Sequence, residues 1–374
     1  MRASRMHGPH GPLMAGLLAT LIGGCAGSSG RAAAIAAATA SPTLAAVGVG
    51  APGESSSAIQ HTLGNQTFTA TNVNGTGTIP VFAASAVVAP HPGITRVVVI
   101  VHGEQRDAGQ YYDDVTDAAT DAGAEANGAF IVAPQFLNTT DVDDPQNAAT
   151  LPSTTLGWRV DEYSDGKDAQ IPAAVSAFDV LDDLVAAFTN RADYPNLQTI
   201  VIAGHSGGAQ LVGRYAIVGT GYESAIGAGY AVRFVVASPS SFLYFDADRP
   251  RHGSYEPGNA TACPTFNSWR YGFGSAPRYV GGADPSQLWQ RFVGLNVTYL
   301  SGPRDTKRNG SIDQSCGAED EGVDRIDRAL KYYGYLTFRN GGTPIQLEHV
   351  VQGVGHDDHA MLTSAPAIAA LFGP

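Results

Sequence analysis

The chain has 374 residues, of which 44% are hydrophobic and 15% charged, so it has enough apolar material for a sizeable core and is not a disordered polymer. Its formal charge of −12 gives it no overall electrostatic attraction for nucleic acid. Three cysteines are too few for a disulfide-rich scaffold or a four-cysteine zinc site.

The N-terminus has the features of an export signal. Arg2 and Arg5 precede the apolar residues 13–22. This run has the length of a signal-peptide core and is too short for a bilayer, which needs about 20 residues. The small residues before Cys25 are similar to a bacterial lipobox, which implies removal of residues 1–24 and lipidation of Cys25. The alternative is ordinary signal cleavage in the alanine-rich stretch that follows.

Residues 25–57 consist mostly of Ala, Gly, Ser, Thr and Pro and carry almost no charge, which predicts a flexible tether. We expect the folded domain to cover residues 58–374. Residues 60–90 are expected to add antiparallel strands at one edge of its sheet.

The folded domain alternates between buried strands and amphipathic helices. Five short apolar, β-branched runs are typical of strands buried on both faces, namely residues 95–101, 129–133, 199–203, 233–237 and 297–300. Residues 345–351 can form a last strand. Helical spacing is found in residues 175–188, 207–218 and 323–335. The alternation predicts an α/β fold, with a mostly parallel central sheet and helices on both faces.

The segment 238–291 interrupts this rhythm. It is rich in Gly and Pro and has no clear period, which predicts an insertion or lid. Eleven of the 32 aromatic residues lie in residues 242–292. They are expected either to line a substrate pocket or to form a small core of the insertion. The candidate pocket residues are His205, Phe242, Tyr244 and Trp269.

Gly204-His205-Ser206-Gly207-Gly208 matches the pattern G-x-S-x-G. An apolar strand precedes it and a helix follows, which predicts a tight turn that presents the serine hydroxyl at the carboxyl edge of the sheet. Small residues two before and two after the serine let neighbouring backbone approach closely. Ser206 is therefore the predicted nucleophile. The alternative is a glycine-rich turn with an uninvolved serine.

A serine hydroxyl needs a base to remove its proton, and the base needs an acid to orient it. His356 follows the last predicted strand in a loop with two glycines, which favours it as the base. Asp305 follows the strand before it, the place of the acid in a Ser…Asp…His chain order. Asp313 and Asp320 are alternatives further along the same loop.

A tetrahedral intermediate also needs backbone donors for its negative oxygen. We expect these to be the amides of Gly207, directly after the nucleophile, and Glu104, directly after the strand 95–101. The Glu104 side chain is unfavourable at this position, because an uncharged residue would repel an oxyanion less.

If Cys25 carries lipid, Cys263 and Cys316 remain, and in an exported protein they most simply form a disulfide. Two buried free thiols are the alternative. The bridge would tie the insertion to the loop that follows Asp305.

Two further patterns are weaker. The run His356-Asp357-Asp358-His359 has metal-ligand residue types, but its ligands would compete with the predicted base, so we expect no metal and no cofactor. Arg106, close to Glu104, is expected to pack structurally rather than to contact an anionic substrate.

These motifs, in this order, resemble the α/β-hydrolase superfamily from about residue 60 to the C-terminus, and more narrowly secreted serine esterases of bacteria and fungi. The supporting stretches are HGEQRDAGQYY (102–112), AGHSGGAQLVGRYA (203–216), WRYGFGSAPRYV (269–280), YLSGPRDT (299–306) and VQGVGHD (351–357). The resemblance implies an α/β-hydrolase fold and a serine hydrolase that cleaves carboxylic esters, small or polymeric.

Amide or lactone cleavage by the same triad, depolymerisation of polyesters, and a silent binding module on the same scaffold stay open as alternatives. The expected location is the cell envelope, with contact to the membrane only through the lipid on Cys25, or alternatively the outside of the cell.

Overall fold

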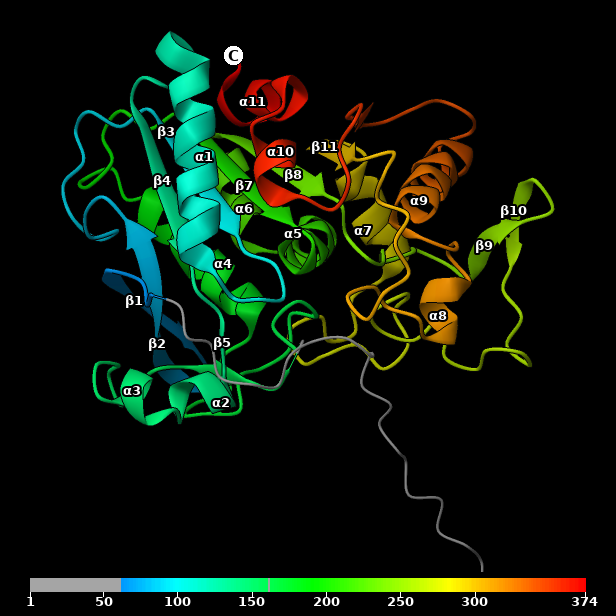
Figure 1. Ribbon diagram of the computed structural model, residues 1–374, viewed down its shortest axis with the longest axis horizontal. Helices are drawn as coiled ribbons and strands as arrows, with labels where there is room; N and C mark the ends of the chain where they lie inside the picture. Colours follow the sequence, from blue (N-terminus) through cyan, green and yellow to red (C-terminus); the bar gives the residue numbers. More distant parts are fainter. Residues whose placement is uncertain (1–61, 161) are drawn as a thin grey trace, which may run out of the picture. The chain divides into compact units, whose positions relative to one another are not determined.

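A mixed sheet runs through the part of the chain that the computed structural model describes, residues 62–160 and 162–374 (Figure 1). The predicted signal peptide, Cys25 and the tether lie outside these residues. In the described part the sheet has eight strands in the order β1-β2-β4-β3-β7-β8-β11-β12. These are β1 (Gln66–Asn72), β2 (Gly75–Ala83), β4 (Ala129–Pro134), β3 (Arg96–Val101), β7 (Thr199–His205), β8 (Ala231–Ala237), β11 (Asn296–Ser301) and β12 (Leu347–Val350).

Six strands that are neighbours in the sheet pair in parallel, namely β4, β3, β7, β8, β11 and β12, whereas β1 and β2 form an antiparallel edge. Both features are as predicted. The strands also start and end close to their predicted positions, because β-branched runs buried on both faces carry a clear signal.

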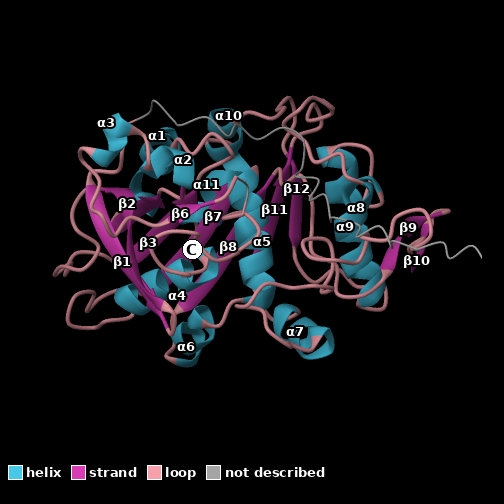
Figure 2. Cartoon of the chain, turned by 90° about the horizontal axis from the view of Figure 1, so that it is seen from below, coloured by secondary structure: helices cyan, strands magenta, loops and turns pink. Residues whose placement is uncertain are grey.

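Helices cover both faces of the sheet, as Figure 2 shows for α1 and α10 on one side and α4 and α6 on the other. Alternate residues of β3 contact the two layers: Val97, Val99 and Val101 join one hydrophobic cluster, and Val98 and Ile100 join the other. The main helices are α1 (Ala108–Ala122), α4 (Ala177–Phe188), α5 (Gly207–Val218), α6 (Gly221–Gly227), α7 (Pro285–Phe292), α9 (Arg325–Arg339), α10 (Asp358–Leu362) and α11 (Ala365–Phe372).

Short elements occupy the connections. They are η1 (Gly123–Ala126), β5 (Leu137–Asn138), α2 (Thr139–Val142), α3 (Pro145–Ala148), β6 (Gly157–Trp158), β9 (Asp248–Arg251), β10 (Ser254–Pro257) and α8 (Cys316–Glu319). None of the helices in the described ranges is both long enough and apolar enough to cross a membrane.

The segment 238–291 holds the β9–β10 hairpin and the start of α7. The predicted disulfide between Cys263 and Cys316 is present, with a Cα–Cα distance of 5.6 Å, and joins this segment to α8. That the segment acts as a lid stays a prediction.

The parallel strands bring four distant parts of the chain to one edge of the sheet. Glu104 follows β3, Ser206 follows β7, Asp305 follows β11 and His356 follows β12. Open α/β sheets bind their ligands at this carboxyl edge.

Candidate active site

Ser206 occupies a strained turn between β7 and α5, with φ 56° and ψ −119°. The glycines on either side allow the turn to form. A Cβ on Gly204 would stand 2.4 Å from the carbonyl carbon of Gly208, and a Cβ on Gly208 would stand 2.1 Å from the carbonyl oxygen of Val101. The elbow is thus packed so tightly on itself at Gly204, and against the end of β3 at Gly208, that only glycine fits at these two positions.

The three side chains predicted as a triad lie in contact. His356 Nε2 is 2.9 Å from Ser206 Oγ, and His356 Nδ1 is 2.8 Å from Asp305 Oδ2. The loops that carry the predicted base and the predicted acid are themselves joined, because the Arg304 amide donates to the Val354 carbonyl at 3.0 Å. The geometry allows the imidazole to accept a proton from the hydroxyl while the carboxylate holds its other nitrogen.

The alternative acids have other partners. Asp313 accepts a hydrogen bond from the Tyr271 hydroxyl at 2.5 Å and pairs with Arg270 at 3.2 Å. Asp320 pairs with Arg251. Of the three aspartates considered, Asp305 is therefore the one placed to orient His356.

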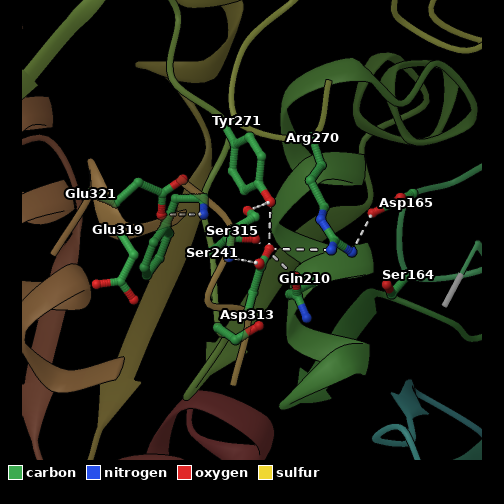
Figure 3. A network of polar contacts seen from close by, with 12 residues as sticks. Ser164, Asp165, Gln210, Ser241, Arg270, Tyr271, Asp313, Ser315, Glu319 and Glu321 are labelled. Carbon is green, nitrogen blue, oxygen red and sulfur yellow. Dashed lines mark hydrogen bonds and ion pairs between the residues drawn. The ribbon is translucent and has the colours of Figure 1, made fainter. Parts of the chain in front are cut away.

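Figure 3 shows the polar network around Asp313. Arg270 bridges Asp313 to Asp165, which it contacts at 3.3 Å. Close by, the Ser241 hydroxyl donates to Gln210 of α5 at 2.9 Å. Arg214 of α5 joins these contacts, because it donates to Gln210 and Ser241. It also lies 3.8 Å from Asp165. The network thereby links the segment after β8, the loop after β11 and the helix that begins at the elbow.

Asp305 has a cationic neighbour that the sequence did not reveal. Arg325, the first residue of α9, places Nη1 3.6 Å from Asp305 Oδ1, and both side chains are buried. A buried carboxylate needs such compensation for its charge. Nothing in the sequence indicated that Arg325, at the start of an amphipathic helix, would face the interior.

The two predicted oxyanion donors are neighbours. The Glu104 amide nitrogen lies 3.3 Å from the position that a Cβ on Gly207 would take. The Glu104 carboxyl group is half-buried, and burial raises its pKa to about 7, against the opposing charge of Arg325. Near neutral pH this carboxyl group is therefore only partly ionised.

Arg106 is a structural residue, as expected. Its Nε donates to Asp141 Oδ2 at 2.7 Å, with both side chains buried, and its Nη1 donates to the Glu104 carbonyl at 2.8 Å. The guanidinium thereby fixes the loop that carries the Glu104 amide.

The candidate pocket residues do not share one location. Phe242 and Tyr244 are 5% and 0% exposed and pack on Tyr332, with ring centroids 4.4 and 5.1 Å away. Both residues belong to the hydrophobic core, which is the alternative that the sequence left open for these aromatic side chains, and a role in a substrate pocket stays a prediction for them. Trp269 is half-buried and donates its indole N–H to the Asp165 carbonyl at 2.9 Å, so a role in substrate binding stays a prediction for it.

His205 is buried beside the base rather than exposed in a pocket. Its ring lies 4.8 Å from that of His356, and its Nδ1 is 3.2 Å from the Tyr111 hydroxyl. Burial lowers the pKa of His205 well below its usual range, so its ring is neutral.

In the described ranges, no three or more His, Cys, Asp or Glu side chains are grouped as metal ligands. His359, part of the run considered above, pairs with Asp114 at 3.1 Å.

No family model matches the sequence, and no curated protein is a recognisable relative of it. Solved structures do resemble the chain. A poly(aspartic acid) hydrolase from Sphingomonas sp. KT-1 is 18% identical, with a TM-score of 0.53 over 84% of this chain and 98% of that one. A poly(3-hydroxybutyrate) depolymerase from Bordetella parapertussis is 19% identical, with a TM-score of 0.51 over 79% and 84%. The strand order and these likenesses establish the α/β-hydrolase fold that the motifs predicted.

Proposed function

We propose that the protein is a serine hydrolase that cleaves carboxylic esters through an acyl-enzyme. The observation that carries the proposal is the double contact of His356, 2.9 Å from Ser206 Oγ and 2.8 Å from Asp305 Oδ2. Burial of Ser206 in a strained elbow at the carboxyl edge of the sheet supports the same function.

In the proposed reaction His356 accepts the hydroxyl proton as Ser206 Oγ attacks the ester carbonyl carbon. The amides of Gly207 and Glu104 donate to the oxygen that becomes negative. His356 then gives the proton to the leaving alcohol. A water molecule, activated by the same imidazole, releases the acid and restores the serine.

The test is labelling of the purified protein by a fluorophosphonate, a probe that reacts with activated serines. We expect Ser206→Ala to abolish labelling and to lower turnover by roughly 10⁶-fold, because the triad acts as a unit. Ser224→Ala, which changes an exposed serine on α6, is expected to change neither. A folded wild-type protein that is not labelled contradicts the proposal.

A panel of substrates would identify the type of bond that the protein cleaves. Aryl acetate and butyrate, the matching amides, a lactone, poly(3-hydroxybutyrate) and poly(aspartic acid) would be compared under one set of conditions, the last two because they are the polymers named for the structural neighbours. We expect the esters to give the highest kcat/KM, and a preference for the amide or the lactone would replace that part of the proposal.

We also propose that the protein is exported and held at the cell envelope by a lipid on Cys25. The disulfide Cys263–Cys316 supports export, because such bonds persist mainly in oxidising compartments.

A further inference from the structure

The peptide that joins Gly103 to Glu104 is held firmly by its carbonyl oxygen. Gly103 O accepts hydrogen bonds from the Tyr163 hydroxyl at 2.9 Å, from His102 Nδ1 at 2.7 Å and from the Arg106 amide at 3.1 Å. Tyr163 and His102 are 1% and 0% exposed, so water does not compete for these bonds.

His102 is a donor to this carbonyl in one defined tautomer. The Phe136 amide donates to His102 Nε2 at 2.9 Å, which leaves Nδ1 as the protonated nitrogen that faces Gly103 O. Burial lowers the pKa of His102 to about 4, so the ring stays neutral near pH 7.

The hydrogen bonds to the Gly103 carbonyl also fix the orientation of the Glu104 amide. In a trans peptide such as this one the C=O and the following N–H point in opposite directions, so donors on Gly103 O set the direction of the Glu104 N–H. The Tyr163 hydroxyl and the Glu104 nitrogen lie 2.8 and 3.3 Å from the same Cβ position on Gly207. The hydrogen bonds to the Gly103 carbonyl therefore lie directly beside the start of α5, the helix that follows Ser206.

We propose that Tyr163 is a positioning residue that, together with His102, aims the Glu104 amide at the oxyanion formed when Ser206 attacks its substrate. This inference rests on the proposed function. Tyr163 acts through the Gly103–Glu104 peptide, so its hydroxyl contributes to the transition state and not to binding of the ground state.

The experiment compares Tyr163→Phe with Tyr194→Phe. Tyr194 is also buried and donates its hydroxyl to a backbone carbonyl, that of Val87 at 2.5 Å, so each variant loses a buried contact of hydroxyl to carbonyl. The Tyr163 hydroxyl also lies 3.3 Å from the His102 carbonyl oxygen. For Tyr163→Phe we expect kcat to fall roughly tenfold, with KM within about twofold of wild type, which is less than the loss of a whole oxyanion donor. Tyr194→Phe is expected to change neither constant.

A second readout separates positioning from structural damage. An arylboronic acid forms a tetrahedral adduct on the serine with an oxygen in the oxyanion site, so its affinity should fall by about the same factor as kcat in Tyr163→Phe. Gly207→Ala is a second variant, because its Cβ would stand 2.8 Å from the Tyr163 hydroxyl, and we expect it to lower kcat as well.

The outcomes are distinct. Equal kcat in Tyr163→Phe and Tyr194→Phe overturns this inference while a labelled wild-type serine upholds the proposed function. A rise in KM at constant kcat, or unchanged boronate affinity, also overturns it. A wild-type protein that fluorophosphonate does not label overturns both proposals.

Discussion

At the scale of single residues, burial disfavours the charged forms of two titratable groups near Ser206. His205 is neutral because it is enclosed, and burial raises the pKa of Glu104 to about 7. A neutral neighbour leaves the field of the proposed oxyanion donors intact, whereas an ionised Glu104 would oppose the negative charge of the proposed transition state. Whether Glu104 opposes the oxyanion therefore depends on pH.

We expect Glu104→Gln to raise activity at alkaline pH. The carboxyl group is mostly neutral below pH 7 and mostly ionised above it, so kcat/KM of the variant should equal that of wild type near pH 5.5 and exceed it about tenfold near pH 8.5. The measurement is the pH profile of kcat/KM for a neutral ester. Glu125→Gln, an exposed carboxylate whose charge acts on Arg96 at the start of β3, is the control and should follow wild type. A constant ratio of Glu104→Gln to wild type across the pH range contradicts the argument.

At the scale of elements, the elbow shows what a sequence can and cannot predict. The helix α5 begins and ends at the predicted residues, because the glycine pattern and the apolar period agree there. The helix α1 was not predicted: its buried face mixes Tyr111 and Val115 with two alanines and the charged Asp114, so it lacks a continuous apolar stripe. Tyr163 was missed for a different reason: its loop has no period, and only the folded backbone brings it to Gly103.

Within α5, two glycines have opposite structural roles. A Cβ on Gly208 would stand 2.1 Å from the Val101 carbonyl oxygen, whereas a Cβ on Gly213 would meet Val236 at an ordinary 3.5 Å. We therefore expect Gly208→Ala to open the elbow, to lower the melting temperature and to abolish fluorophosphonate labelling. Gly213→Ala should keep full labelling and gain up to about 1 kcal/mol from helix propensity. Similar labelling of the two variants would show that the elbow tolerates a side chain next to β3.

At the scale of the whole molecule, the contact among Ser206, Asp305 and His356 was predictable because a parallel sheet brings its strand ends to one edge. The G-x-S-x-G motif indicated Ser206, and the positions of Asp305 and His356 after later strands suggested the other two proposed roles. The burial of several charged residues was not predictable. Arg249 and Arg328 are 0% exposed and lie near the equally buried Glu321, although each is an ordinary surface residue type in the sequence. Which charged residues face inward depends on how the segment after β8 packs on α9, and no local pattern encodes that.

The buried carboxyl group of Glu321 makes the stability of this packing depend on pH. Its Oε2 accepts the Phe242 amide at 2.9 Å, and burial raises its pKa from 4.5 to about 8, against the opposing charges of Arg328 and Arg249. Since the pKa in the folded state is the higher one, the stabilisation from the bound proton is fully present below about pH 4.5 and is lost as the pH rises through about 8.

We therefore expect Glu321→Gln, which mimics the neutral acid, to match wild type near pH 5 and to be the more stable protein near pH 9. The difference in the free energy of unfolding should grow by up to roughly 1.4 kcal/mol per pH unit within this window. Urea denaturation at a series of pH values measures it. If wild type instead becomes the more stable protein as the pH rises, Glu321 is ionised in the fold and held by Arg249 and Arg328, and the buried cluster is an ion network rather than a carboxylic acid enclosed among arginines.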